Sequence, residues 1–214
     1  MELIHWFIDV ILHLDSHLVE LLRDYGFWVY FILFAIVFAE TGFVVTPFLP
    51  GDALLFAAGA LSAVDTSGTL SAPLVCLTLI AAAVTGNTTN YYIGRWIGPP
   101  AFSGKYRFLK VEYLRRTEEF FARHGSMTLV LARFVPIVRT CVPFVAGIAR
   151  MPYARFQGFN LLGALVWVLA LVWAGFFFGN IPIIKNNFGF VTIGIVLVSV
   201  MPMAWVALKE TLKK

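Results

Sequence analysis

The sequence predicts an all-α polytopic membrane protein, and three observations support this fold class. Sixty per cent of the 214 residues are hydrophobic, and only 13 per cent are charged. The apolar residues form long runs separated by short polar segments, which is typical of several bilayer spans in one membrane domain. Two of the runs are interrupted by proline, glycine and charged residues, a pattern that predicts helices broken inside the membrane.

The first segment, residues 1–24, predicts an amphipathic helix that lies in the membrane interface. Its polar residues recur at steps of three or four between large apolar residues, which produces one polar face. Asp9, His13 and His17 on this face could hold a metal ion, but a wetted polar face explains the same spacing. The sequence therefore predicts neither a metal site nor a cofactor.

Residues 25–64 predict a first re-entrant helical hairpin. A helix needs about 20 residues to cross a hydrocarbon core of about 30 Å, and the second apolar arm, 53–64, is too short to do so. The turn between the two arms contains the predicted hairpin-breaking residues Pro47, Pro50 and Gly51. A plain crossing followed by a half-helix is the alternative.

Residues 72–94 predict a transmembrane helix, because they are apolar and long enough to cross the bilayer. The last third of this span is rich in hydroxyl and amide side chains. Asn87, Asn90 and Tyr91 are the predicted polar lining of a cavity or of helix contacts. Residues 95–125 are mostly polar and predict a cytoplasmic amphipathic segment with a solvated face.

Residues 126–150 repeat the broken pattern and predict a second re-entrant hairpin. Pro136 and Pro143 are its predicted hairpin-breaking residues. Two ordinary transmembrane helices are predicted after it, at residues 156–179 and 190–208.

The distribution of basic residues predicts the orientation of these elements. Most of the 16 lysine and arginine residues lie in residues 95–123, in the turn at 150–155 and in the C-terminal tail, which share one side of this topology. The positive-inside rule places that side in the cytoplasm. The two hairpins then open to opposite faces. The sequence thus predicts an inverted repeat of hairpin plus transmembrane helix, with a site near the midplane as in secondary transporters.

Four charged residues inside the two hairpins form the candidate site. An acid at bilayer depth costs about 2.5 to 3.5 kcal/mol on insertion scales, so Glu40 and Asp52 need to face protein, water or a partner charge. Arg133 and Arg139 carry the opposite sign, and pairing lowers the burial cost of each charge. A structural ion network that locks the hairpins would use the same residues. Against it, Pro and Gly beside the charges free backbone groups, which is typical of ion and anion sites.

The chemistry of these side chains indicates phosphate and protons. Arginine presents a planar fork of donors that suits phosphate and stays charged when buried, so Arg133 and Arg139 are the predicted phosphate-binding residues. Glu40 and Asp52 are titratable and are the predicted proton-coupling or substrate residues. Protonation of either acid would release an arginine for an anion, which would couple proton movement to substrate movement.

Several long motifs resemble the founding branch of the DedA family of bacterial inner-membrane proteins, and the similarity runs nearly end to end. These motifs are FAETGFVVTPFLPGDALLFAAGAL, GNTTNYYIGRWIG, RHGSMTLVLARFVPIVRTCVPFVAGIARMPYARF and NLLGALVWV. The resemblance implies a multi-pass inner-membrane transporter or flippase with two re-entrant hairpins. It also implies a more distant relationship to eukaryotic lipid scramblases of the VTT domain group.

The resemblance further implies a substrate and a set of residues. Family members are linked to the return of undecaprenyl phosphate, the carrier lipid of cell-wall synthesis, to the cytoplasmic leaflet, and to dependence on the proton motive force. The family's essential acids correspond to Glu40 and Asp52, and its essential arginines to Arg133 and Arg139. Many relatives have an acid where this chain has Asn87, which could hydrogen-bond a headgroup or a neighbouring helix.

The predicted function is a lipid-phosphate flippase whose partners are protons and an anionic lipid, either a polyprenyl phosphate or a phospholipid. A proton-coupled antiporter or small-solute carrier is the alternative, and a phospholipid scramblase is less favoured.

An enzyme is not predicted, because no histidine lies in either broken segment. Nucleic acid is not a predicted partner, since the basic residues flank membrane spans. Small residues on the spans would permit a homodimer.

Overall fold

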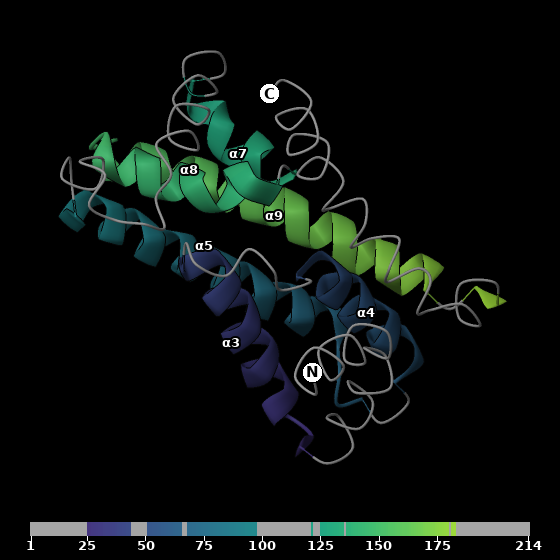
Figure 1. Cartoon of the computed structure of the whole chain (residues 1–214). Helices are drawn as coiled ribbons and strands as arrows, with labels where there is room; N and C mark the ends of the chain where they lie inside the picture. The colour runs from purple at the N-terminus through teal and green to yellow at the C-terminus, as the bar shows by residue number, and fades with distance from the viewer. Residues whose placement is uncertain are drawn as a thin grey trace, which may run out of the picture. The chain divides into compact units, whose positions relative to one another are not determined.

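The computed structural model describes residues 25–43, 51–65, 68–97, 121, 125–134, 136–179 and 181–182. Every regular element in these ranges is helical, which confirms the predicted all-α class (Figure 1). The longer helices are α3 (Trp28–Gly42), α4 (Gly51–Val64), α5 (Ala72–Ile97), α8 (Pro136–Ile148) and α9 (Tyr153–Phe178). Between α5 and α8 lie the short elements η2 (Gly125–Met127), α7 (Thr128–Leu131) and η3 (Ala132–Phe134).

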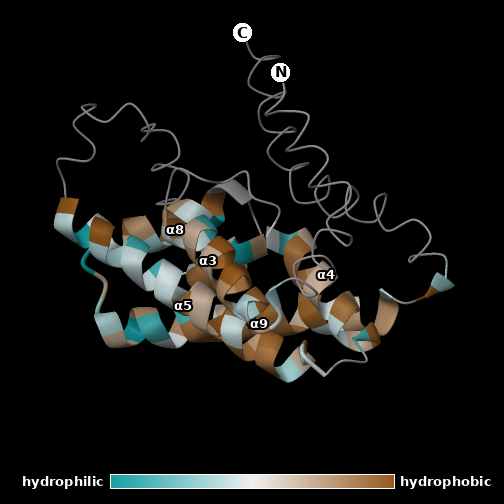
Figure 2. Ribbon diagram, turned by 90° about the horizontal axis from the view of Figure 1, so that it is seen from below, coloured by the Kyte–Doolittle hydropathy of each residue, from teal (hydrophilic) through white to brown (hydrophobic). Residues whose placement is uncertain are grey.

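Two of the described helices, α5 and α9, are long and apolar enough to cross a membrane. Each has 26 residues, which corresponds to about 39 Å and exceeds a hydrocarbon core of about 30 Å. Apolar positions predominate along α9, whereas hydrophilic turns interrupt α5 (Figure 2). Helix α5 extends the predicted span 72–94 at its C-terminal end, and α9 begins before the predicted span 156–179. The predicted span 190–208 lies outside the described residues.

The two arms of the first predicted hairpin are both helical and both short. Helix α3 has 15 residues and α4 has 14, so each measures about 21 to 22 Å and falls short of a bilayer core. Gly51 is the first residue of α4, while Pro47 and Pro50 lie outside the described residues. The re-entrant path and the inverted repeat stay predictions, as do the N-terminal helix and most of the segment 95–125.

The second broken segment is a run of short elements followed by the 13 residues of α8. Helix α8 begins at Pro136, where the missing N–H is tolerated. The prediction that Pro143 breaks the segment is wrong, because α8 continues through it. Proline deprives the carbonyl of Arg139 of its helical donor, but Asn90 Nδ2 donates to the next carbonyl, that of Thr140, at 2.9 Å. Donors from neighbouring helices allow membrane helices to contain proline.

The chain forms two compact units. Unit 1 comprises residues 1–36, 50–79 and 168–201, and unit 2 comprises residues 37–49, 80–167 and 202–214. In unit 1, α4 packs closely against the C-terminal part of α9, where a Cβ atom at Gly59 would lie 2.0 Å from the carbonyl oxygen of Val172. The two backbones therefore touch, as is common between membrane helices.

In unit 2, α5 and α8 touch backbone to backbone at two places, which we call the α5–α8 seam. A Cβ atom at Gly94 would lie 2.1 Å from the carbonyl oxygen of Phe144, and one at Gly147 would lie 2.0 Å from that of Tyr91. An apolar cluster of buried residues surrounds the seam: Tyr91, Leu129, Ala132, Val142, Ala146 and Phe156. The seam fixes α8 relative to α5 and thereby positions Arg139, the charged residue of α8.

Candidate functional site

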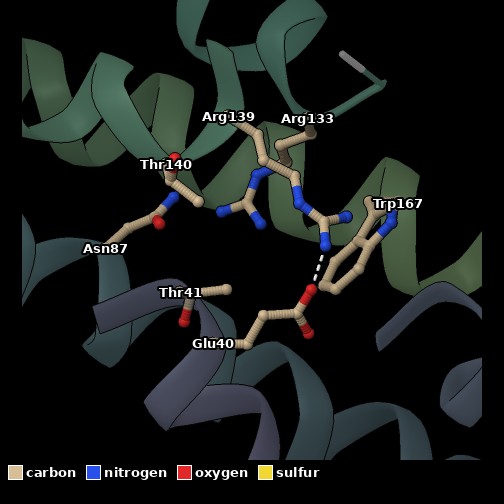
Figure 3. A pocket seen from close by; sticks show the side chains of 7 residues that line it. All are labelled: Glu40, Thr41, Asn87, Arg133, Arg139, Thr140 and Trp167. Carbon is tan, nitrogen blue, oxygen red and sulfur yellow. Dashed lines mark hydrogen bonds and ion pairs between the residues drawn. The ribbon is translucent and has the colours of Figure 1, made fainter. Parts of the chain in front are cut away.

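Unit 2 contains a small pocket to which α3, η3, α5, α8 and α9 all contribute (Figure 3). The residues that line it are Glu40, Thr41, Asn87, Arg133, Arg139, Thr140 and Trp167. Its cavity volume is about 10 Å³, which is space for about one water molecule. A phosphate group is larger than this, so it fits only after side chains move apart.

The pocket contains an ion pair between Glu40 and Arg139, in which Arg139 Nη2 donates to Glu40 Oε1 (Figure 3). The Glu40 side chain is 1% exposed and that of Arg139 is 14% exposed. Glu40 lies in the last turn of α3 and Arg139 is the fourth residue of α8. A helix disfavours negative charge at its C-terminus and positive charge at its N-terminus. Each charge therefore lies at the unfavourable end of its own helix, and the pairing offsets both penalties.

Arg133 is the second cation of the pocket and is held differently. It is 6% exposed, and its Nη2 donates to the side-chain oxygen of Asn160 at 2.8 Å and to the backbone carbonyl of Asn160 at 3.3 Å. Among the described residues, no carboxylate contacts Arg133, and its buried Nε has no hydrogen-bond partner. Within the described ranges, Arg133 thus has no acid beside it to neutralise its charge.

The ring of Trp167 lies beside both arginines. The guanidinium carbons of Arg133 and Arg139 are each 5.8 Å from the centroid of the Trp167 ring. A cation at this distance from a buried indole is attracted to its electron-rich face, by about 0.5 to 2 kcal/mol. Trp167 therefore partly offsets the repulsion between two guanidinium groups in one pocket.

Asn87 is the only residue of the predicted polar lining that lines this pocket. Its Nδ2 also donates to Asn160 Oδ1 at 3.0 Å, which joins α5 to α9. Asn90 lies behind the pocket wall and is fully buried. Its Nδ2 donates to the backbone carbonyls of Thr41 at 3.4 Å and of Thr140 at 2.9 Å, so it connects α5 with α3 and α8.

Of the two predicted roles of Tyr91, cavity lining or helix contact, the structure shows the helix contact. Its ring is fully buried and stacks on Phe156, with 4.4 Å between the ring centroids. Its hydroxyl donates to the carbonyl of Met151 at 2.5 Å and accepts from Arg95 Nη1 at 3.1 Å. Because the hydroxyl of Tyr91 has these hydrogen-bond partners, its ring can be buried in the apolar cluster without leaving a polar atom unsatisfied.

Asp52 lies in the first turn of α4, within unit 1, whereas the seven pocket residues all belong to unit 2. A carboxylate in the first turn of a helix is favoured by the helix dipole, which gives Asp52 a structural role of its own. Its part in proton coupling stays a prediction. Asp9, His13 and His17 lie outside the described residues, and the residues within the described ranges contain no cluster of three metal-binding side chains.

Sequence reasoning did not single out Thr41, Thr140, Asn160 or Trp167. Asn160 carried a signal, because it is an amide within an otherwise apolar span, and such residues usually bond across helices. Trp167 carried none, since an aromatic residue in a membrane span is ordinary. Its proximity to both arginines depends on the tertiary structure.

Taken together, the two helices of membrane-spanning length and the buried pair of Glu40 and Arg139 are typical of a helical membrane protein. The family model described as VTT domain matches residues 49–177. The chain is 49% identical over 203 residues to protein DedA of Escherichia coli strain K12, covering 94% of this chain and 92% of that protein. The chain belongs to the DedA family of VTT-domain membrane proteins, as its motifs predicted.

Other relatives agree with this assignment. The chain is 43% identical over 169 residues to an uncharacterized membrane protein of Mycobacterium tuberculosis strain H37Rv, covering 78% of this chain and 73% of that protein. It is 38% identical over 174 residues to inner membrane protein YghB of Escherichia coli strain K12, covering 81% and 75%. No solved structure matches the chain. The protein is a component of the bacterial inner membrane, as its relatives are and as α5 and α9 allow.

Proposed function

We propose that the protein moves a lipid phosphate, most specifically undecaprenyl phosphate, across the inner membrane in a proton-dependent reaction. The observation that carries this proposal is Arg133, a buried guanidinium with no carboxylate partner among the described residues, beside the second guanidinium of Arg139. An unneutralised buried cation is costly and is suited to an incoming anion. Phosphate matches the donor geometry of arginine.

Glu40 determines whether the second arginine is available to the substrate. While Glu40 is ionised, it holds Arg139 in the ion pair. When Glu40 takes up a proton, the attraction weakens and both guanidinium groups can turn toward the anion. The cavity of about 10 Å³ then has to widen as Glu40 and Arg139 separate. Protonation of Glu40 therefore raises the affinity of the pocket for the anion, and binding of the anion raises the affinity of Glu40 for a proton.

The start of α8 adds to the attraction for an anion. Helix α8 begins at Pro136, three residues before Arg139, and has 13 residues. The unbonded N–H groups and the partial positive charge of a helix N-terminus favour phosphate. In this mechanism only the phosphate headgroup enters the pocket, and the polyprenyl chain stays in the lipid.

Flipping of a fluorescent polyprenyl phosphate in proteoliposomes tests the proposal. Arg133→Lys and Arg139→Lys are each expected to slow proton-driven flipping by about tenfold or more, because lysine lacks the bidentate fork. Arg155→Lys makes the same chemical change at an exposed position of α9 and is expected to keep the wild-type rate. Wild-type flipping no faster than in protein-free liposomes, or full activity of Arg133→Lys, would overturn the proposal.

A proton-coupled antiporter or small-solute carrier is the second candidate. It is favoured by the size of the cavity, which suits a water molecule or a small ion better than a headgroup. It would use Glu40 as the proton carrier and the arginines as structural partners. Uptake of a soluble ion into proteoliposomes that lack the carrier lipid would support this candidate. Proton-independent flipping of labelled phospholipids would instead identify a scramblase.

A further inference from the structure

We infer that α9 carries a cradle for Arg133, formed by Asn160, Gly163 and Trp167, and that Asn160 is the residue that positions this arginine in the pocket. The three cradle residues are spaced at i, i+3 and i+7, so they lie on one face of α9. The inference deepens the proposed function, because it names what holds the anion-binding group in place.

Asn160 holds Arg133 through a fully satisfied amide. Its side chain is fully buried, and its Oδ1 accepts from Arg133 Nη2 at 2.8 Å and from Asn87 Nδ2 at 3.0 Å. Its Nδ2 donates to the carbonyl of Val84 at 3.1 Å and to Gln157 Oε1 at 2.9 Å. The two donated bonds fix the direction of the amide, so its oxygen faces the guanidinium.

Gly163 provides the space in which the side chain of Arg133 lies. A Cβ atom at Gly163 would be 2.9 Å from Arg133 Nε and 3.1 Å from Arg133 Cδ. Any larger residue at this position would therefore displace the arginine. One turn further along α9, Trp167 presents its ring to the same guanidinium.

The cradle restrains Arg133 without neutralising it. An amide oxygen accepts a hydrogen bond but carries no net charge, so the guanidinium keeps its positive charge for an anion. An aspartate at position 160 would have nearly the same shape and would form an ion pair with Arg133. The contrast between asparagine and aspartate therefore separates positioning of the arginine from simple packing of α9.

The affinity of the full-length protein for geranyl phosphate in detergent tests the inference. Asn160→Asp is expected to raise the Kd by about tenfold or more, because the new carboxylate competes with the phosphate for Arg133. Gln157→Glu makes the same amide-to-acid change one turn earlier on α9, at a residue that contacts Asn160 and not Arg133. It is expected to raise the Kd by less than about threefold. Wild-type affinity in Asn160→Asp would overturn the inference.

Thermal unfolding in two backgrounds provides a readout that does not depend on the ligand. In the wild type, Asn160→Asp loses the two bonds that Nδ2 donates but gains an ion pair with Arg133, so the loss of Tm is expected to be small. In an Arg133→Gln background the same change also buries an unpaired acid and is expected to lower the Tm by more. Equal Tm changes in both backgrounds would overturn the inference that Asn160 positions Arg133. If the wild type fails to bind geranyl phosphate, the proposed function fails, while this comparison still decides the cradle.

Gly163→Ala provides an independent variant. It is expected to weaken binding of geranyl phosphate by about threefold or more, because the added methyl group displaces Arg133. Gly158→Ala is the control on the same helix, since no atom of the described residues lies within 4 Å of a Cβ atom there. Equal Kd values for the two alanine variants would contradict the inference.

Discussion

Arg139 of α8 pairs with Glu40 of α3 across 99 positions of the sequence, and each of the two residues lies at the helix end that disfavours its charge. A pair selected for stability alone would place the acid at the start of a helix and the base at its end. The observed placement therefore lowers the free energy needed to separate the two charges. Local rules of this kind are typically broken at functional sites.

Exchange of the two charges tests this interpretation. The double variant Glu40→Arg with Arg139→Glu restores an ion pair and puts each charge at the helix end that favours it. Each favourable placement is worth about 0.3 to 1 kcal/mol, so the Tm is expected to equal or exceed that of the wild type. Proton-driven flipping is expected to be lost, because the acid no longer controls an arginine of α8. Glu40→Arg alone, which brings two cations together, serves as the destabilised control. A double variant as unstable as this single variant would contradict the interpretation.

The α5–α8 seam leads to a second prediction. Gly94→Ala is expected to destabilise the protein by about 1 to 3 kcal/mol, because the added methyl group meets the carbonyl of Phe144. Gly158→Ala is expected to stabilise it by up to about 1 kcal/mol, because alanine is the better helix former and the site is open. Thermal unfolding in detergent measures both effects. Tm changes of the same sign in the two variants would argue against the seam.

Trp167 leads to a third prediction. Trp167→Leu removes the ring beside both guanidinium groups and is expected to raise the Kd for geranyl phosphate several-fold. This corresponds to a loss of about 1 kcal/mol of binding free energy. Trp167→Phe keeps an aromatic face and is expected to lose less affinity. Trp173→Leu is the control, because Trp173 belongs to unit 1 and packs against Phe177. A larger loss in Trp167→Phe than in Trp167→Leu would contradict the cation–π contact.

Asn90 leads to a fourth prediction. Asn90→Ala removes the donor to the carbonyls of Thr41 and Thr140 and is expected to destabilise the protein by about 1 to 3 kcal/mol. Thr89→Ala is expected to cost less than about 0.5 kcal/mol, since among the described residues the Thr89 hydroxyl bonds only within α5, to the carbonyl of Thr85. Urea or thermal unfolding of the two variants measures the difference, and equal losses would contradict the role of Asn90.

The sequence predicted the class of the fold and one contact of the site. Apolar runs longer than a bilayer is thick predict spanning helices directly, and α5 and α9 agree with that prediction. Opposite charges in two apolar segments predict that an acid meets an arginine, and Glu40 meets Arg139. The sequence could not determine which acid pairs with which arginine, because that choice depends on the packing of the helices.

Pro143 and Tyr91 show which details a single sequence does not determine. A proline in an apolar run was interpreted as a break, but a break is required only where no other group satisfies the freed carbonyls. Asn90 donates to the carbonyl of Thr140, which neighbours the carbonyl of Arg139 that Pro143 leaves without its helical donor. Tyr91 follows a polar run and was interpreted as lining either a cavity or a helix contact. The structure shows the helix contact, because a tyrosine can bury its ring and reach a backbone carbonyl with its hydroxyl. Both outcomes depend on neighbours from other helices.

The contact between Gly86 and Thr41 differs in kind from the seam. A Cβ atom at Gly86 would lie 2.0 Å from the hydroxyl oxygen of Thr41, which is a side-chain atom, and 3.0 Å from the backbone carbonyl oxygen of Phe38, whereas the nearest atoms to Gly94 and Gly147 are all backbone atoms. A hydroxyl can rotate to another rotamer within nanoseconds, but a backbone carbonyl inside a helix stays where it is. An inhibitor of this protein should therefore be sought among compounds that bind beside Thr41 in the pocket, because there a small molecule can displace a hydroxyl group without deforming a helix.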